Sequence, residues 1–145
     1  MKNPLTLGFS PCPNDTFMFY PLVHGLVDTG GYRFNERLED VETLNKLAVK
    51  GVLDVTKVSY AALGHFREQY ALLRAGSALG RGCGPLLVAK EQLDPAALQG
   101  RTIAIPGRYT TAHLLMRLYN PDLTTFLEMP FHEIMDAVMT GRADA

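Results

Sequence analysis

Short apolar runs alternate along the chain with segments whose apolar residues recur at helical spacing. The apolar runs predict strands over residues 5–9, 33–39, 53–58, 70–75, 85–90, 101–107 and 124–129. The helical spacing predicts helices over residues 16–26, 40–51, 59–69, 94–100, 110–120 and 131–141. Strands that alternate with helices are typical of βα units in a parallel sheet. The pattern therefore predicts an α/β fold.

Local signals refine three of the predicted helices. Pro21 is expected to kink or divide the first helix, which is apolar enough to be mainly buried. Asp40 is suited to cap the second helix, and Gly51 to follow its end. The last helix carries an apolar stripe that we expect to pack into a core, formed by Ile134, Met135, Val138 and Met139.

The composition adds limits on partners and compartment. Of the 145 residues 47% are hydrophobic, and the net charge is −1, which gives no support to a nucleic acid or a membrane as partner. No stretch approaches the ~20 apolar residues of a membrane helix and the start has no export signal, so we expect a cytoplasmic protein. Two cysteines are too few for a disulfide framework, and four scattered histidines predict no metal site.

Small polar side chains follow three of the predicted strands, at the start of the next helix. Ser10 and residues 14–16 follow the first strand, Ser59 follows the third, and Thr110 with Thr111 follows the sixth. A helix N-terminus offers unpaired N–H groups and a partial positive charge, which suit a carboxylate or a phosphate. Ligands of open α/β sheets lie beyond the carboxyl ends of the strands. These corners are therefore candidate anion sites, although each is also explained by simple helix capping.

Other side chains near these corners allow two interpretations each. Cys12 is interpreted as a packing or ligand contact rather than as a nucleophile, because no base lies close to it in the sequence. Lys57 is either a partner for a ligand anion or a solvated lysine at a strand end, and Arg108 can add a further charge. Tyr60 and Tyr109 either line the same crevice or belong to the core.

The last residues, GRADA, read as a helix-ending glycine followed by the approach to another strand. From this pattern we expect the chain to be the N-terminal part of a longer protein. The alternative is a short domain with a frayed end.

Five blocks of the sequence resemble the 1,4-dihydroxy-6-naphthoate synthase family, which acts late in the futalosine route to menaquinone. They are LGFSPCPNDTFMFYPLVHG (7–25), LEDVETLNKLA (38–48), TKVSYAAL (56–63), ALGRGCGPLLVA (78–89) and IPGRYTTAHLL (105–115). The resemblance implies a type II periplasmic-binding-protein fold, in which two α/β domains enclose a substrate cleft. It places a first domain at residues 1–88 and the beginning of a second at 89–145, with the C-terminal part of the fold missing from this chain.

The implied reaction is a carbon–carbon lyase step. Proton abstraction beside a carbonyl and elimination would convert cyclic dehypoxanthine futalosine, a small-molecule carboxylate, to 1,4-dihydroxy-6-naphthoate. The family needs no metal or organic cofactor, and its general base is a His expected beyond Ala145, so the resemblance leaves the catalytic residue of this chain unknown and the 145-residue chain inactive alone. None of the four histidines matches that position: His24, His65, His113 and His132.

The resemblance also transfers a set of substrate-contacting positions. They are Asn14, Asp15, Thr16, Lys57, Ser59, Thr110, Thr111 and Ala112. Two alternatives stay open: a cytoplasmic carboxylate-binding module of the same fold without catalysis, and a chorismate-type dehydratase, which the SPCPND loop disfavours. The oligomeric state is left open as well.

Overall fold

The computed structural model describes residues 3–145, apart from the side chains of residues 95 and 96. The chain divides into two compact units, Met1–Leu79 and Gly80–Ala145. Both units contain parallel strands connected by helices, so the predicted mixed α/β class is confirmed. The predicted domain division after residue 88 and the two-domain binding-protein architecture stay predictions.

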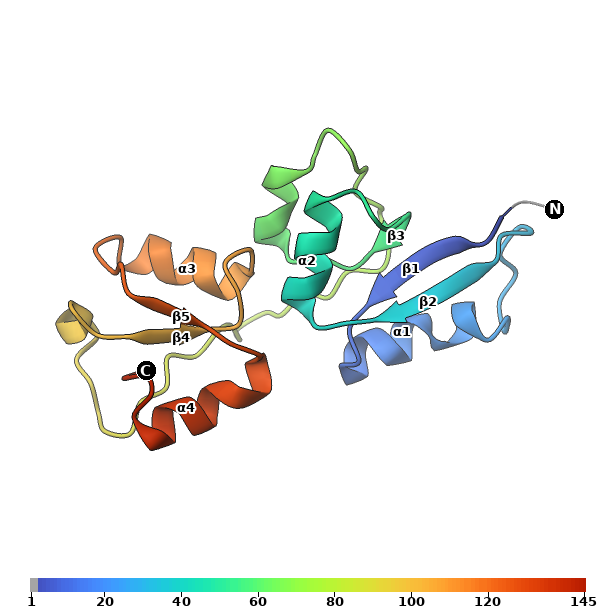
Figure 1. Ribbon diagram of the computed structural model, residues 1–145. Coiled ribbons are helices and arrows are strands. Elements are labelled where there is room, and N and C mark those ends of the chain that lie inside the picture. Colours follow the sequence, from blue (N-terminus) through green and yellow to red (C-terminus); the bar gives the residue numbers. More distant parts are fainter. Residues whose placement is uncertain (1–2) are drawn as a thin grey trace. The chain divides into compact units, whose positions relative to one another are not determined.

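The first unit is a three-stranded parallel sheet with connecting helices (Figure 1). Its elements are β1 (Leu5–Phe9), α1 (Pro13–Val23), β2 (Phe34–Leu38), α2 (Val41–Val49), β3 (Val55–Thr56) and the 3-10 helix η1 (Tyr60–His65). The strand order is β2-β1-β3, and Leu7 of β1 lies opposite Glu36 on one side and Val55 on the other. The chain therefore steps from β1 to one neighbour and returns to the opposite side.

The central strand β1 presents different side chains to its two faces. Leu7 and Phe9 are buried on one face, and the ring of Phe9 lies 4.9 Å from the ring of Phe19 on α1. Gly8 faces the other way, and a Cβ there would lie 2.9 Å from Leu44 of α2 and 2.5 Å from Leu53. Glycine at this position thus lets α2 and the loop before β3 approach the sheet closely.

The second unit has a two-stranded parallel sheet between two helices (Figure 1). Its elements are η2 (Pro95–Leu98), β4 (Ile103–Ile105), α3 (Thr111–Tyr119), β5 (Phe126–Glu128), η3 (Phe131–Glu133) and α4 (Ile134–Thr140). After α4, Gly141 adopts φ 77° and turns the chain back to β4. There the Asp144 N–H donates to the Thr102 carbonyl, and the Ala104 N–H donates to the Ala145 carbonyl.

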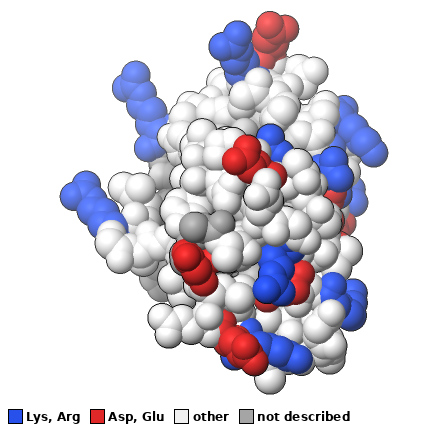
Figure 2. All heavy atoms as spheres, turned by 90° about the vertical axis from the view of Figure 1, so that its left-hand side faces the viewer, with Lys and Arg blue, Asp and Glu red and all other residues white. Residues whose placement is uncertain are grey.

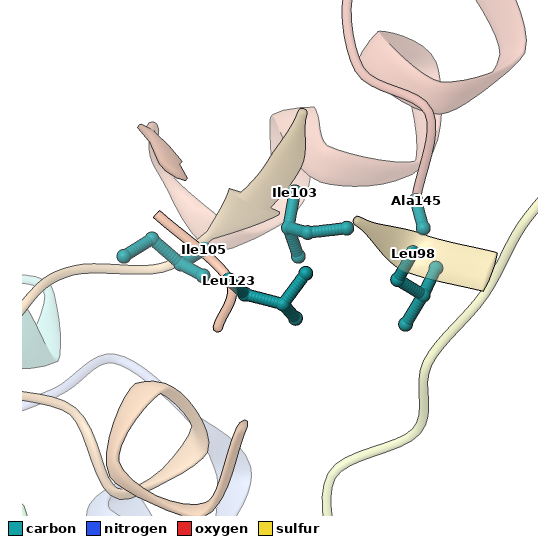
Figure 3. Packing of buried hydrophobic residues seen from close by; sticks show 5 residues of the cluster. All are labelled: Leu98, Ile103, Ile105, Leu123 and Ala145. Atoms are coloured by element: carbon teal, nitrogen blue, oxygen red, sulfur yellow. The ribbon is translucent and has the colours of Figure 1, made fainter. Parts of the chain in front are cut away.

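Side chains of β4 alternate between two small cores. Ile103 and Ile105 pack with Leu98, Leu123 and Ala145 on one face (Figure 3). The intervening residue of the strand, Ala104, packs on the opposite face with the buried residues Met129, Ala137, Val138 and Ala143. Period-two alternation of this kind is expected for a strand covered by helices on both faces.

Two predicted strands are absent, which corrects the sequence interpretation. Residues 70–75 and 85–90 have no strand assignment, and Leu72, Leu73 and Leu86 are exposed. A strand is held by backbone hydrogen bonds to a neighbour. Within residues 3–145, neither segment pairs with a strand of either sheet.

The predicted helices need four corrections. α1 runs through Pro21 undivided, because the proline lies in its last turn, where one lost N–H breaks only one bond. It is also not mainly buried, since Asp15 is its one buried residue and Phe17 is 86% exposed. The helix expected at 59–69 is a short 3-10 helix. In α4, Met135 and Met139 are exposed, so the core stripe is wrong for these two residues.

Charged side chains of both signs are interspersed on the face shown in Figure 2, as the small net charge suggests. No helix in residues 3–145 is long and apolar enough to cross a membrane.

A reciprocal hydrogen-bond clamp joins β1 to the loop before β3. The Thr6 N–H and hydroxyl donate to the Asp54 carboxylate at 2.8 and 2.7 Å, and the Asp54 N–H donates back to the Thr6 hydroxyl at 2.8 Å. These bonds lower the pKa of the Asp54 carboxyl below its ordinary value of 3.8. The bond from the Thr6 backbone N–H has the larger effect, and the bond from the Thr6 hydroxyl the smaller. The clamp therefore favours the ionised carboxylate.

We predict that Asp54→Asn lowers stability at pH 7 but not in acid. A carboxylate whose pKa is lowered by folding contributes stability above its unfolded pKa and loses it as the pH falls through the folded value. The difference in urea midpoint between the parent chain and Asp54→Asn should thus shrink below pH ~4. Asp122→Asn, an equal charge change at another exposed position, is the control. A constant difference from pH 7 to pH 2 would contradict this account.

Candidate functional site

The strand order of the first unit creates a topological switch point at the carboxyl ends of β1 and β3. The chain leaves β1 toward β2 on one side and later reaches β3 on the other. Loops that leave neighbouring strands in opposite directions open a crevice at those ends, where α/β proteins bind ligands. Residues 10–16 follow β1 and residues 57–59 follow β3, so the predicted polar corners lie at this position.

A buried carboxylate connects these two corners. Asp15 is 5% exposed, and its Oδ2 accepts hydrogen bonds from the Ser10 N–H at 3.1 Å and the Ser10 hydroxyl at 2.8 Å. Its Oδ1 lies 3.4 Å from the Lys57 ammonium, which also donates to the Gly76 carbonyl at 3.0 Å. The Lys57 side chain is only 19% exposed, so its interpretation as a solvated strand-end lysine is wrong.

Ser59 is held by a buried amide from α2. The Ser59 N–H donates to the Asn45 Oδ1 at 2.9 Å, and the Asn45 Nδ2 donates to the Ser59 Oγ at 3.1 Å. Asn45 is fully buried, and its Nδ2 also donates to the Glu42 Oε2 at 3.3 Å. The Lys46 ammonium lies 3.7 Å from the other oxygen of Glu42. Ser59 is therefore supported by a chain of three polar residues, Asn45, Glu42 and Lys46.

The remaining predicted residues of the first corner lie at the start of α1. The Thr16 hydroxyl donates to the Cys12 carbonyl at 3.0 Å, a bond back to the residue one helical turn earlier. Asn14 is exposed on the same turn. Cys12 is an exposed free thiol at the N-cap position, and its side chain makes no capping bond.

The third predicted corner lies in the second unit, at the carboxyl end of β4. Thr110 is buried, and its hydroxyl both donates to the Gly107 carbonyl at 2.6 Å and accepts from the His113 N–H at 3.3 Å. The Thr110 side chain is thus a helix cap with its hydrogen bonds used. Thr111 and Ala112 form the first turn of α3 and are half-buried. The Arg108 guanidinium lies 2.6 Å from Glu128, so a carboxylate already neutralises the charge expected here.

Two residues that support the site were not among the sequence candidates. Glu42 and Asn45 looked like ordinary polar positions of a helix. Both nevertheless share the buried face of α2 with Leu44 and Ala48. Polar side chains at the spacing of the apolar face are the signal that marks a buried network.

The described residues contain no group of three or more histidine, cysteine, aspartate or glutamate side chains that could hold a metal ion. Two of the histidines contact aromatic rings instead. His24 lies 4.2 Å from Tyr20, and His113 lies 4.8 Å from Phe126, both measured between ring centroids.

We predict that substitutions of Asp15 and Lys57 have non-additive effects on the free energy of unfolding. Breaking a buried ion pair leaves one charge without its partner and costs about 3 kcal/mol, whereas removing both partners costs less than the sum. Lys57→Met and Asp15→Asn should each lower the free energy of unfolding in urea by about this amount. The double variant should be less stable than the parent chain by clearly less than twice that amount, with Lys90→Met as the exposed control. Additive losses would show that the pair contributes little.

Comparison with known proteins finds a family and several relatives to which this chain is similar. A family profile described as menaquinone biosynthesis matches residues 5–145. The chain is 50% identical over 97% of its length to a 1,4-dihydroxy-6-naphthoate synthase of Thermus thermophilus, and 47% identical over 97% to one of Streptomyces coelicolor. It covers 50% and 51% of these two relatives, so the chain spans about half the length of the curated relatives it matches.

A solved structure has a similar fold. The crystal structure of protein AF1704 from Archaeoglobus fulgidus superposes with a TM-score of 0.89 at 40% identity, over 97% of this chain and 52% of that one. The family profile covers nearly the whole chain, including the polar corners after β1, β3 and β4. This chain belongs to the menaquinone biosynthesis family, as the resemblance to 1,4-dihydroxy-6-naphthoate synthases predicted.

Proposed function

We propose that the chain is the N-terminal portion of an enzyme that converts cyclic dehypoxanthine futalosine to 1,4-dihydroxy-6-naphthoate. The observation that carries the proposal is the 50% identity, over 97% of the chain, to a relative named for that product. The span matched by the family profile, residues 5–145, includes the polar corners as well as the core. The reaction is a carbon–carbon lyase step in the cytoplasm.

The product carries a carboxylate, and the corners offer groups that recognise one. Hydroxyl donors and the N–H groups of a helix start form charge-assisted hydrogen bonds with a carboxylate. In the first unit Ser59 has such a hydroxyl, and in the second unit Thr111 and Ala112 lie in the first turn of α3. We assign carboxylate recognition to groups of this kind.

Asp15 and Lys57 act differently from these donors in our proposal. Their mutual contact and the Lys57 bond to the Gly76 carbonyl keep the loops after β1 and β3 in fixed positions. Lys57 still contributes positive potential to a bound anion, because its largely buried ammonium is only weakly screened by water. Asn14 and Thr16 contribute to the wall of the site at the start of α1.

Catalysis needs a base that abstracts a proton beside a carbonyl, and aromatisation of the ring drives the elimination. Such a base must reach the substrate within hydrogen-bond distance. We place it in the half of the enzyme that the relatives possess and this chain does not span. That half would also complete a type II binding-protein architecture, in which the substrate lies in a cleft between domains.

We predict that the 145-residue chain yields no product and that the complete reading frame does. Both are incubated with cyclic dehypoxanthine futalosine, and dihydroxynaphthoate is measured by chromatography. Product from the complete protein alone supports the lyase assignment and the position of the base. Tight binding without product would identify a carboxylate-binding module instead, and turnover by the 145-residue chain would contradict the placement of the base.

A further inference from the structure

The last residues of the chain run along the edge of β4 that β5 does not occupy. The Ala145 N–H donates to the Thr102 carbonyl at 3.5 Å, and the Ala145 carbonyl accepts from the Ala104 N–H at 2.7 Å. A residue that bonds in this way to both neighbours of Ile103 lies opposite Ile103 in a parallel pairing. The side chains of Ala145 and Ile103 accordingly pack in the same buried cluster (Figure 3). Ala145 is therefore bonded like the first residue of a third parallel strand.

The carboxylate of Asp144 holds this pairing in place. Its Oδ2 accepts from the Thr102 N–H at 2.8 Å, and its Oδ1 accepts from the Arg101 guanidinium at 3.1 Å. The Asp144 N–H donates back to the Thr102 carbonyl at 2.8 Å. The bond from the Thr102 N–H, followed by the bond from Arg101, lowers the pKa of the Asp144 carboxyl below its ordinary value of 3.8. Asp144 is thus an ionised side chain with both oxygens bonded to the two residues before β4.

Apolar packing alone specifies the register of this edge weakly. The buried residues on either side of Asp144 are Ala143 and Ala145, whose methyl groups bury little surface. A slip by one residue would turn every later side chain of the strand to the opposite face. It would also separate the Asp144 carboxylate from the Thr102 N–H and from Arg101. The carboxylate therefore supplies the register that the alanines do not.

The direction of this strand leads to a ligand-binding edge of the sheet. A strand rises about 3.3 Å per residue, so a chain parallel to β4 from the position opposite Ile103 comes level with Ile105 after roughly 7 Å. Beyond that level lies the carboxyl end of β4, where Gly107 and Thr110 lead into α3. Because β5 and Ala145 lie on opposite sides of β4, this end is a switch point, where α/β proteins bind ligands.

We propose that Asp144 is a positioning residue, whose carboxylate sets the register of the strand that continues past Ala145 and with it the approach of the catalytic base to the substrate. This rests on the proposed function, which places the base in the half that the relatives possess and this chain does not span. The strand leads into that half at the carboxyl end of β4. A reacting group displaced by 1 Å can lose about a hundredfold in rate. Asp144 touches no substrate itself and acts only through this strand.

Amide hydrogen exchange, measured by NMR on the complete reading frame, tests the register without any substrate. Along β4 the Ile103 N–H donates to the Thr125 carbonyl, on the β5 side, whereas the Ala104 N–H donates to the Ala145 carbonyl, on the other side. We expect Asp144→Ala to speed exchange of the Ala104 amide by about tenfold or more, and to change that of the Ile103 amide by less than about threefold. Equal acceleration at both amides would show general destabilisation, and an unchanged Ala104 amide would show that Asp144 fixes nothing. Either result would overturn the inference.

Kinetics of the same variants with the futalosine substrate test what the register does for catalysis. Asp144→Ala should lower kcat by about a hundredfold, because the base is displaced. It should keep KM within about threefold, because the groups that recognise the carboxylate are unchanged. Asp144→Asn should recover most of kcat, since its amide oxygen still accepts the Thr102 N–H. The matched control is Asp136→Ala, which removes an exposed carboxylate of α4 in the same unit and should keep both parameters.

A parent-like kcat in folded Asp144→Ala would overturn the inference. So would a raised KM with kcat unchanged, because Asp144 would then act on binding. Failure of the parent protein to turn over substrate contradicts the proposed function instead, and the exchange comparison still tests the register.

If Asp144→Ala does not fold, a crystal structure of the complete parent protein decides. We expect the Asp144 carboxylate to keep the Thr102 N–H, and the residue two positions after Ala145 to lie opposite Ile105 in a parallel strand. A chain that turns away from β4 directly after Ala145, or an Asp144 side chain turned to solvent, would overturn the inference.

Discussion

The contact between the Asp15 carboxylate and the Lys57 ammonium is the interaction on which the first unit's site depends. It joins the start of α1 to the residue after β3, and through Ser10 and the Gly76 carbonyl it reaches two further loops. Both charges are largely removed from water, so the pair is stable only while all its hydrogen bonds are made. Such a pair fixes the loops after β1 and β3 before any ligand arrives.

The same arrangement of backbone occurs in each unit. In the first, β1 lies between β2 and β3, and in the second, β4 lies between β5 and the chain at residues 144 and 145. A helix begins at the carboxyl end of each central strand, at Pro13 and at Thr111. The strand order thus places a helix N-terminus at a switch point twice, which explains why the polar corners look alike in the sequence.

Sequence patterns predicted the features that local chemistry determines. Asp40 caps α2 and Gly141 ends α4 as expected, because capping depends on neighbouring residues only. The prediction of strands at 70–75 and 85–90 was wrong, because a strand also needs a neighbouring strand to pair with, and a local pattern gives no information about that neighbour. Asn45 was missed for a similar reason. Its hydrogen bonds are made to Ser59, 14 residues away, and no local pattern links these two positions.

The central claim is that the corner after β3 receives a carboxylate through Ser59. The measurement that tests it most directly is a crystal structure of the complete protein with 2-naphthoate. The account predicts a carboxylate oxygen within hydrogen-bond distance of the Ser59 Oγ, with the Asn45 Nδ2 still donating to that same oxygen atom of Ser59. A naphthoate bound with its carboxylate elsewhere, or a Ser59 hydroxyl turned to cap η1, would contradict it.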